Sequence, residues 1–207
     1  MAKFDFKKNY KVLYNASPGE IRFVQVPSLR FLMADGVGDP GTAPAFAEAV
    51  AALYGVSYTL KFMLKRGDSP LDYVVPPLEA LWWAENYEVF SPERMDRDAW
   101  QWTLMIPQPE VVTGDLALEA ARQASAKKEL QALNRLRLAE FEEGLSVQLL
   151  HMGPYAEEAA SIERMHLFMR ENGCEFNGKH HEIYLNDPRR TQPEKLKTIL
   201  RQPVRKT

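Results

Sequence analysis

The stretch VQLLHMGPYAEE, residues 147–158, holds the pattern that decides the fold. Its first six residues, Val147 to Met152, form an apolar run that predicts a strand, and Gly153–Pro154 predicts a turn. Apolar residues at helical spacing then predict a helix over Glu157–Asn172, and a further strand is predicted over His181–Leu185. The order is therefore strand, glycine turn, helix, strand.

The same order occurs earlier in the chain. A strand over Leu29–Asp35 is followed by a helix with Pro44 in its first turn and Thr42 as its expected cap, and then by a strand over Leu78–Trp83. Two such units usually lie side by side, and the groove between their helices becomes a concave site. The pattern predicts an α+β fold with a weak internal repeat. Because no Gly/Ser-rich linker separates the halves, we expect a single domain over residues 1–207.

Other segments are predicted from composition and spacing. A long helix is expected over residues 115–143, dense in Ala, Leu, Lys, Arg and Glu, with Gly144 as its C-cap. The remaining predictions are an aromatic lead-in over residues 1–20, strands over Ile21–Val26 and Ala99–Ile106, and a solvated basic tail over residues 189–207.

Charge and composition narrow the function classes. The chain has 207 residues and a net charge of −2, so it lacks the strong positive charge that is typical of nucleic-acid-binding proteins. Its first residues, MAKFDFKKNYKVLYN, contain no long apolar run, which argues against a signal peptide or membrane helix and favours a cytoplasmic location. A small molecule is the expected partner, rather than nucleic acid or a membrane.

Glu182 is the first candidate for a functional residue. It lies in an otherwise apolar predicted strand, and the two-residue period of a strand places Glu182, Tyr184 and His180 on one side. In an apolar cleft the pKa of this carboxyl would rise by desolvation, which suits a general base and also suits pairing with a cationic ligand. The alternative is a solvent-facing charge on an exposed face.

Aromatic residues supply further candidates. Trp82 and Trp83 are adjacent in a strand and point to opposite faces, so one of them is expected to line the cleft while the other packs in the core. Trp100 and Trp102 share a face and are typical of core residues. Tyr155, after a Gly–Pro turn, is placed to donate a hydrogen bond to a ligand carbonyl, a role for which Tyr184 competes.

The sequence gives no support for a metal, a cofactor, or a serine or cysteine nucleophile. The four histidines are scattered, and the HExxH and GxSxG patterns are absent. Cys174, the single cysteine, cannot form an intramolecular disulfide, and it has no base nearby in the sequence. The glycines of residues 36–41, GVGDPG, lack the spacing of a phosphate loop. We expect neither a metal nor a cofactor.

Several dispersed segments, taken together and in order, resemble the GyrI-like family within the SOUL/GyrI-like superfamily. The segments are FAEAVAALYGVSYTLKF (46–62), VVPPLEALWW (74–83), WQWTLMIPQP (100–109), VQLLHMGPYAEE (147–158) and HHEIYLNDPRRTQPEKLKTILRQPV (180–204). The resemblance covers roughly residues 21–204 and points to the stand-alone branch with a Trp–Trp pair.

The resemblance implies duplicated strand–helix–strand–strand modules, also called SHS2 modules, related by a pseudo-two-fold axis around a ligand cleft. It places Glu182 at the position of the acidic residue at the centre of that cleft. It also implies an activity, because members of the Trp–Trp branch resemble hydrolases that open electrophilic cyclopropanes in planar genotoxins. The chain departs from the regulator branch, since no helix-turn-helix segment is fused to it.

Two hypotheses for the function follow. In the first, the protein is a detoxifying cyclopropanoid hydrolase in which Glu182 activates water and Tyr155 or Tyr184 polarises a carbonyl. In the second, it is a non-catalytic multidrug-binding or sensor module for aromatic cations; action on a larger protein such as a topoisomerase rests on the family name alone. The expected ligand-binding residues are Trp82, Trp83, Trp102, Met105, His151 and His180.

Overall fold

Two compact units make up the structure. The computed structural model describes residues 3–67, 70–90 and 93–207. Unit 1 comprises Met1–Phe6, Leu29–Pro76 and Trp82–Phe141, and unit 2 comprises Lys7–Ser28, Pro77–Leu81 and Glu142–Thr207. Helices and antiparallel strands occur in both units, which confirms the predicted α+β class.

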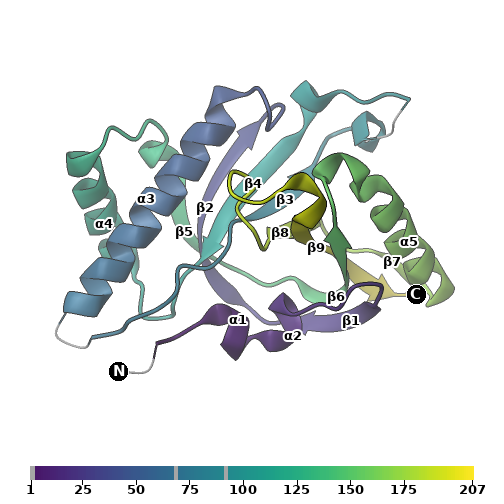
Figure 1. The fold of residues 1–207 in the computed structure, drawn as a ribbon, viewed down its shortest axis with the longest axis horizontal. Coiled ribbons are helices and arrows are strands. Elements are labelled where there is room, and N and C mark those ends of the chain that lie inside the picture. Colours follow the sequence, from purple (N-terminus) through teal and green to yellow (C-terminus); the bar gives the residue numbers. More distant parts are fainter. Residues whose placement is uncertain (1–2, 68–69, 91–92) are drawn as a thin grey trace. The chain divides into compact units, whose positions relative to one another are not determined.

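Unit 1 is a small antiparallel sheet covered by helices. Its central strand β2 (Leu29–Val37) pairs with β4 (Gln101–Pro107) on one side and with β5 (Leu136–Phe141) on the other. Helix α3 (Pro44–Arg66) packs on β2 and β4, and it contacts α4 (Gly114–Lys127), as Figure 1 shows. The buried face of α3 consists of small and aliphatic residues, namely Ala49, Ala52, Leu53, Val56 and Leu60. Its short helices are η1 (Tyr87–Phe90), η2 (Arg97–Ala99) and η3 (Leu133–Arg135).

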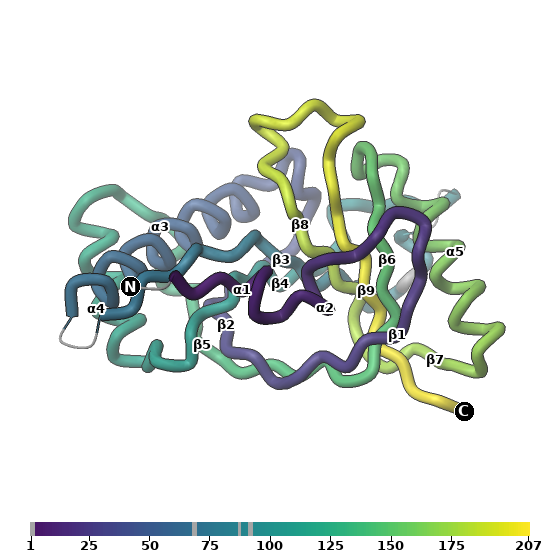
Figure 2. The backbone as a smooth tube through the Cα atoms, turned by 60° about the horizontal axis from the view of Figure 1, so that its bottom comes forward, coloured from purple at the N-terminus to yellow at the C-terminus, as the bar shows by residue number. Residues whose placement is uncertain are grey.

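Unit 2 has a sheet in the order β1 (Ile21–Val26), β6 (Gly144–Met152), β9 (Lys197–Lys206), β8 (His180–Tyr184). These strand pairs are antiparallel, and the short strand β7 (Cys174–Phe176) also pairs with β9. Figure 2 shows β6 and β9 side by side, with the chain between β8 and β9 extending beyond the strands. The helices are α2 (Lys11–Tyr14), η4 (Tyr155–Glu157), α5 (Glu158–Glu171), η5 (Pro193–Lys195) and α1 (Phe6–Asn9), whose first residue belongs to unit 1.

The two faces of the unit 2 sheet differ in chemistry. Residues directly opposite each other on antiparallel strands share a face. One face carries Leu149 opposite Leu200, and it packs with Met165 and Met169 of α5 in an apolar core. The other face carries the polar side chains of Gln148, Arg201 and His181, which are all buried. Each face therefore forms its own layer of interactions.

Strand β3 (Glu79–Trp83) contributes to both units. Its residues 79–81 belong to unit 2, whereas Trp82 and Trp83 belong to unit 1. The predicted duplication of modules, the cleft between them and the single-domain organisation stay predictions.

The predicted long helix over residues 115–143 is wrong in its second half. Helix α4 ends at Lys127, and Leu136–Phe141 form strand β5. The segment LRLAEF also fits the two-residue period of a strand, and its pairing with β2 outweighs the helix propensity of its residues. Gly144, with a φ of 71°, begins strand β6 instead of capping a helix.

The predicted solvated tail is also wrong, because Lys197–Lys206 form strand β9 between β6 and β8. Ile199, Leu200 and Val204 are buried there, and the one charged residue in the middle of the strand, Arg201, is paired with a carboxylate. A central strand with basic residues at its ends and in its middle therefore resembles a basic tail when its partners are unknown.

The start of helix α3 differs in one detail. The N-cap is Ala43, which makes no capping bond through its side chain, so the prediction that Thr42 caps the helix is wrong. The Asp39 carbonyl oxygen accepts hydrogen bonds from the amides of Thr42 (3.2 Å) and Ala43 (2.8 Å), which turns the chain before Pro44.

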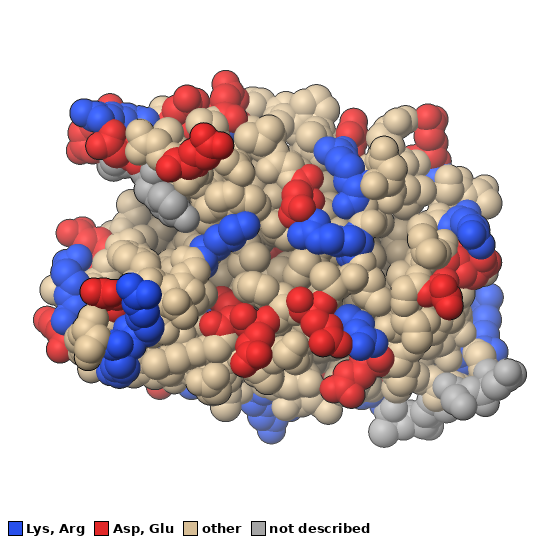
Figure 3. Space-filling model, turned by 180° about the vertical axis from the view of Figure 1, so that it is seen from behind, with Lys and Arg blue, Asp and Glu red and all other residues tan. Residues whose placement is uncertain are grey.

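Charge is distributed without a dominant sign over the face seen in Figure 3, where basic and acidic side chains are interspersed. This agrees with the small net charge of −2. Among the described residues, no helix is long and apolar enough to cross a membrane.

Candidate functional site

The candidate site lies in unit 2, on the sheet face covered by α5. Tyr184 Oη donates a hydrogen bond to Glu182 Oε2 at 2.8 Å, which confirms that these two residues of β8 share a face. The Glu182 side chain is only 14% exposed, and His180 Nε2 lies 3.7 Å from its second carboxylate oxygen. Burial and the nearby His166 and His181 lower the pKa of His180 to about 4, so His180 is neutral at pH 7.

Tyr155 joins this group from the turn that follows β6. Gly153, with a φ of 136°, reverses the chain, and the short helix η4 then presents Tyr155 with its ring edge-on to Tyr184, at 5.6 Å between centroids. Burial, together with the negative charges of Glu158, Glu182 and Asp187, raises the pKa of Tyr155 to about 12. Its hydroxyl therefore remains a hydrogen-bond donor at neutral pH.

Glu158, which sequence reasoning missed, is the first residue of α5 and is 6% exposed. Burial raises its pKa, the Glu182 carboxylate raises it further, and the Thr198 hydroxyl offsets part of the effect, so that the pKa of Glu158 is about 9. Two carboxyl groups that share a site cannot both ionise easily. Glu158 is accordingly protonated at neutral pH while Glu182 accepts the bond from Tyr184.

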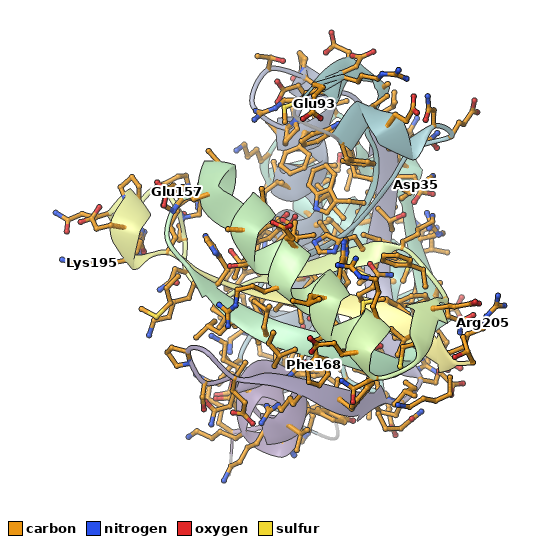
Figure 4. All side chains as sticks on the ribbon, turned by 90° about the vertical axis from the view of Figure 1, so that its right-hand side faces the viewer. Asp35, Glu93, Glu157, Phe168, Lys195 and Arg205 are labelled. Atoms are coloured by element: carbon orange, nitrogen blue, oxygen red, sulfur yellow. The ribbon has the colours of Figure 1, made fainter. Side chains whose placement is uncertain are left out.

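A signal for Glu158 was present in the sequence. Its position lies four and seven residues before Ile162 and Met165, so Glu158 continues the apolar face of α5. Its neighbour Glu157 is exposed. Figure 4 shows α5 across the strands of unit 2, with Glu157 at its N-terminal end. A carboxyl on an apolar helix face is a candidate for a buried, perturbed group.

His151 supports the turn that carries Tyr155. It is 6% exposed; its Nδ1 lies 3.0 Å from Ser161 Oγ and its Nε2 lies 3.3 Å from the Pro154 carbonyl oxygen. These contacts connect β6 to the first turns of α5. His151 thus holds the loop in place, while its predicted contact with a ligand stays a prediction.

A second cluster of charged residues is buried on the opposite sheet face. His181 Nδ1 lies 2.9 Å from Glu143 Oε2, and His181 Nε2 lies 3.0 Å from Glu79 Oε2. Arg201 donates to Glu143 Oε2 at 2.9 Å, and the Tyr14 hydroxyl donates to Glu79 Oε1 at 2.6 Å. We call these five residues the buried network.

The charges of the buried network stabilise one another. Burial alone would lower the pKa of His181, but Glu143 and Glu79 outweigh it and raise the pKa to about 9. Burial would likewise raise the pKa of Glu143, but His181 and Arg201 lower it to about 2. Arg201 Nη2 also donates to the Leu13 carbonyl oxygen at 2.9 Å, which anchors helix α2. The network is a structural element of unit 2.

The predicted aromatic and methionine ligand residues lie in unit 1. Trp82 is 6% exposed and packs on Phe46, at 6.1 Å between ring centroids, and on Trp100, at 5.8 Å. Trp83 is partly exposed, whereas Trp102 and Met105 are fully buried. Their contacts with a ligand stay predictions.

Within the described ranges, no group of three or more His, Cys, Asp and Glu residues is arranged to hold a metal ion.

Comparison of the chain with known protein families identifies one family to which it is similar. The model of the GyrI-like small molecule binding domain matches residues 19–205. An uncharacterized conserved protein from Listeria innocua is 43% identical, with a TM-score of 0.89 over 98% of this chain and 100% of that chain. A second Listeria innocua structure, described as a hydrolase, is 42% identical, with a TM-score of 0.85 over the same shares. The C-terminal domain of EcmrR, 12% identical with a TM-score of 0.57 over 91% of this chain and 98% of that chain, shares the fold. No match was found among curated proteins.

Proposed function

We propose, for a chain that belongs to the GyrI-like small-molecule-binding family, that unit 2 carries a hydrolytic site for planar, largely hydrophobic molecules with an electrophilic cyclopropane ring. The observation that carries the proposal is the sheltered Glu182 carboxylate, held by Tyr184 at 2.8 Å beside Tyr155. The Listeria innocua relatives described as hydrolases support hydrolysis as the reaction class. Detoxification in the cytoplasm would be the corresponding biological role.

The proposed reaction adds one water molecule to the substrate. Glu182 accepts a proton from the water molecule. At the same time the water oxygen forms a bond to a cyclopropane carbon, and the adjoining ring C–C bond breaks. The electron pair of that bond moves through the conjugated system onto a carbonyl oxygen, which becomes an enolate or phenolate. Tyr155 donates a hydrogen bond to this oxygen, and a proton returned to it completes the product.

Tyr184 positions the base. Its hydrogen bond fixes one oxygen of Glu182, and the other oxygen is directed toward His180. An oriented carboxylate loses less freedom when it takes up a water molecule in attack geometry. For further ligand contacts within unit 2 we propose His151 and His180 as supporting residues.

The test compares Glu182→Gln with the wild type on a panel of planar carbonyl compounds that bear an activated cyclopropane. Glutamine keeps the size and an acceptor oxygen for Tyr184 but does not accept a proton at neutral pH, so turnover should fall by roughly 10²–10⁴ with little change in affinity for neutral ligands. Glu175→Gln, at an exposed ion pair on β7, is the matched control and should retain full turnover. Equal turnover in Glu182→Gln and the wild type would remove Glu182 from the mechanism.

A non-catalytic binding module for aromatic cations is the second candidate. It is favoured by the negative charges of Glu182 and Asp187 acting on Tyr155, which also favour a bound cation beside the ring. In that case Glu182→Gln should weaken the binding of planar cations and leave neutral planar ligands unaffected. Titration calorimetry with a matched cation and its neutral analogue separates the two candidates.

A further inference from the structure

We propose that Glu158 is a catalytic residue of this site, the general acid that protonates the oxygen on which negative charge collects while Glu182 acts as the base. This inference rests on the proposed hydrolysis and adds to it the source of the second proton. It concerns a residue from a different element, because Glu158 begins α5 whereas Glu182 lies on β8.

The side chains that act on the Glu158 carboxyl belong to the candidate site. On β9, Thr198 is opposite Tyr184 of β8 and opposite His151 of β6, so these three residues share one face. The Glu182 carboxylate and the Thr198 hydroxyl both act on the pKa of the Glu158 carboxyl, and Glu182 is opposite Leu200, two residues further along β9. Helix α5, which begins with Glu158, packs against β6 of the same sheet.

One oxygen of Glu158 is available for a ligand. Its Oε1 is buried and, among the described residues, has no hydrogen-bond partner, although the residue is only 6% exposed. A buried polar atom without a partner lowers stability, and a bound group that satisfies it removes that cost. A ligand oxygen at hydrogen-bond distance from Oε1 would supply the missing partner.

The protonation state matches the proposed role. With a pKa of about 9, set first by burial and then by Glu182, Glu158 holds its proton at neutral pH. When their environments give two neighbouring carboxyl groups different pKa values, the group with the higher pKa acts as the acid and the other acts as the base. The other titratable groups around the pair include Tyr155 on η4, His180 and Tyr184 on β8 and, in the loop after β8, Asp187.

Glu158 and Glu182 together supply and take up every proton that the proposed reaction moves. At the start Glu158 is protonated and Glu182 is ionised. Water loses a proton to Glu182 as the new C–O bond forms and the ring C–C bond breaks, and Glu158 gives its proton to the resulting oxyanion. Transfer of the proton from Glu182 to Glu158 restores the starting state, so one water molecule is consumed and no proton from bulk solvent is required.

The test measures turnover against pH for Glu158→Gln, which keeps the size and offers an amide donor without a transferable proton. We expect a loss of roughly 10²-fold near pH 7, in the range typical of a general acid. Wild-type turnover should decline as the pH rises through about 9, where Glu158 ionises, and the variant should lack this alkaline decline. The exposed neighbour Glu157 supplies the control, Glu157→Gln, which should retain the wild-type profile.

A second readout needs no substrate. The folded state binds the Glu158 proton more tightly than the unfolded state, so this group destabilises the fold increasingly as the pH rises from about 4.5 to about 9. Glu158→Gln removes the ionisation, and its Tm relative to the wild type should rise across that window. A glutamate with only a structural role, accepting hydrogen bonds as an anion, would give a Tm loss that grows with pH.

The outcomes separate the two proposals. If the wild type turns over the substrate, Glu182→Gln does not, and Glu158→Gln matches the wild type in rate and pH profile, the Glu158 assignment is overturned while the hydrolase proposal stands. A Tm loss in Glu158→Gln that grows with pH overturns the assignment as well. If the wild type turns over no activated cyclopropane, the hydrolase proposal fails and the acid role fails with it.

Discussion

Replacing Glu143 by glutamine tests the buried network directly. The wild-type carboxylate is 2.9 Å from His181 Nδ1 and 2.9 Å from Arg201 Nη1, and all three side chains are at most 3% exposed. Glu143→Gln conserves volume but leaves two buried cations with Glu79 as the remaining anion of the network. Removing one partner of a buried ion pair is strongly destabilising, because the other charge stays buried without compensation.

The expected loss of stability in Glu143→Gln follows from the raised pKa of His181. A rise in the pKa of His181 from 6.5 to about 9 corresponds to about 3 kcal/mol of favourable interaction with its charged partners. Glu143 contributes more to this rise than Glu79. We therefore expect Glu143→Gln to lower the free energy of unfolding by about 3 kcal/mol at pH 6, in line with other broken buried pairs.

The pH dependence has a definite sign. The pKa of His181 is raised in the folded state, so its contribution is complete below pH 6.5 and is lost as the pH rises through about 9. The pKa of Glu143 is lowered, so its contribution is complete above pH 4.5 and is lost as the pH falls through about 2. The difference in the free energy of unfolding between wild type and variant should therefore be largest between pH 4.5 and pH 6.5, where both contributions are complete, and smaller at pH 9.5.

Urea unfolding at pH 6 and at pH 9.5 measures this difference, with Glu142→Gln, at an exposed neighbouring position, as the control. The contribution of Glu158 to the pH dependence is present in both proteins and cancels. A loss below about 0.5 kcal/mol at pH 6, the range of ordinary surface substitutions, would refute the reasoning that the network stabilises the fold.

Two further predictions concern packing. A Cβ atom at Gly36 would overlap the buried Trp102 ring, so Gly36→Ala should lower the free energy of unfolding by about 1–3 kcal/mol or more in the same urea titration. Gly114→Ala is the control, because its Cβ position is open space, and it should leave the free energy of unfolding nearly unchanged. Cys174 packs in the apolar core of unit 2, and its sulfur donates to the Asn172 carbonyl oxygen at 3.6 Å. Cys174→Ser should lower the Tm slightly and keep turnover and ligand affinity, and a loss beyond about tenfold, or about 1.4 kcal/mol, with the fold intact would contradict this.

The sequence predicted those elements that are bounded by strong local signals. Strand β1 was predicted with its observed bounds, and β6 and α5 were placed within a few residues, because Gly153–Pro154 separates two clear periodicities. The errors arose where two periodicities fit the same residues, as in LRLAEF of β5, or where charged residues made a central strand resemble a tail, as in β9. Pairing between distant strands decides such segments, and local composition does not reveal it.

The residues of the candidate site were predictable to different degrees. The shared face of Glu182 and Tyr184 follows from the two-residue period of a strand, and Glu158 was accessible from its spacing to the apolar face of α5. The partners of His181 were not accessible, because Glu79 and Glu143 are 102 and 38 residues away in the chain. Such contacts exist only once the sheet has formed.

Charge balance distinguishes the two polar layers of unit 2. In the buried network, two carboxylates face a protonated histidine and an arginine, so the formal charges cancel. The arrangement stabilises the fold without a need for a ligand.

On the other face of the sheet the balance is different. The nearby His180 is neutral at pH 7, and the negative charge of the two glutamates is reduced by keeping a proton on Glu158. That solution leaves a buried acid next to a base, a state that is unfavourable for folding alone and suited to proton transfer. The sheet face that is less favourable for stability is therefore the face where we expect catalysis. Near neutral pH, Glu143→Gln should lose stability and Glu158→Gln should gain it, so a stability measurement on both variants tests this difference.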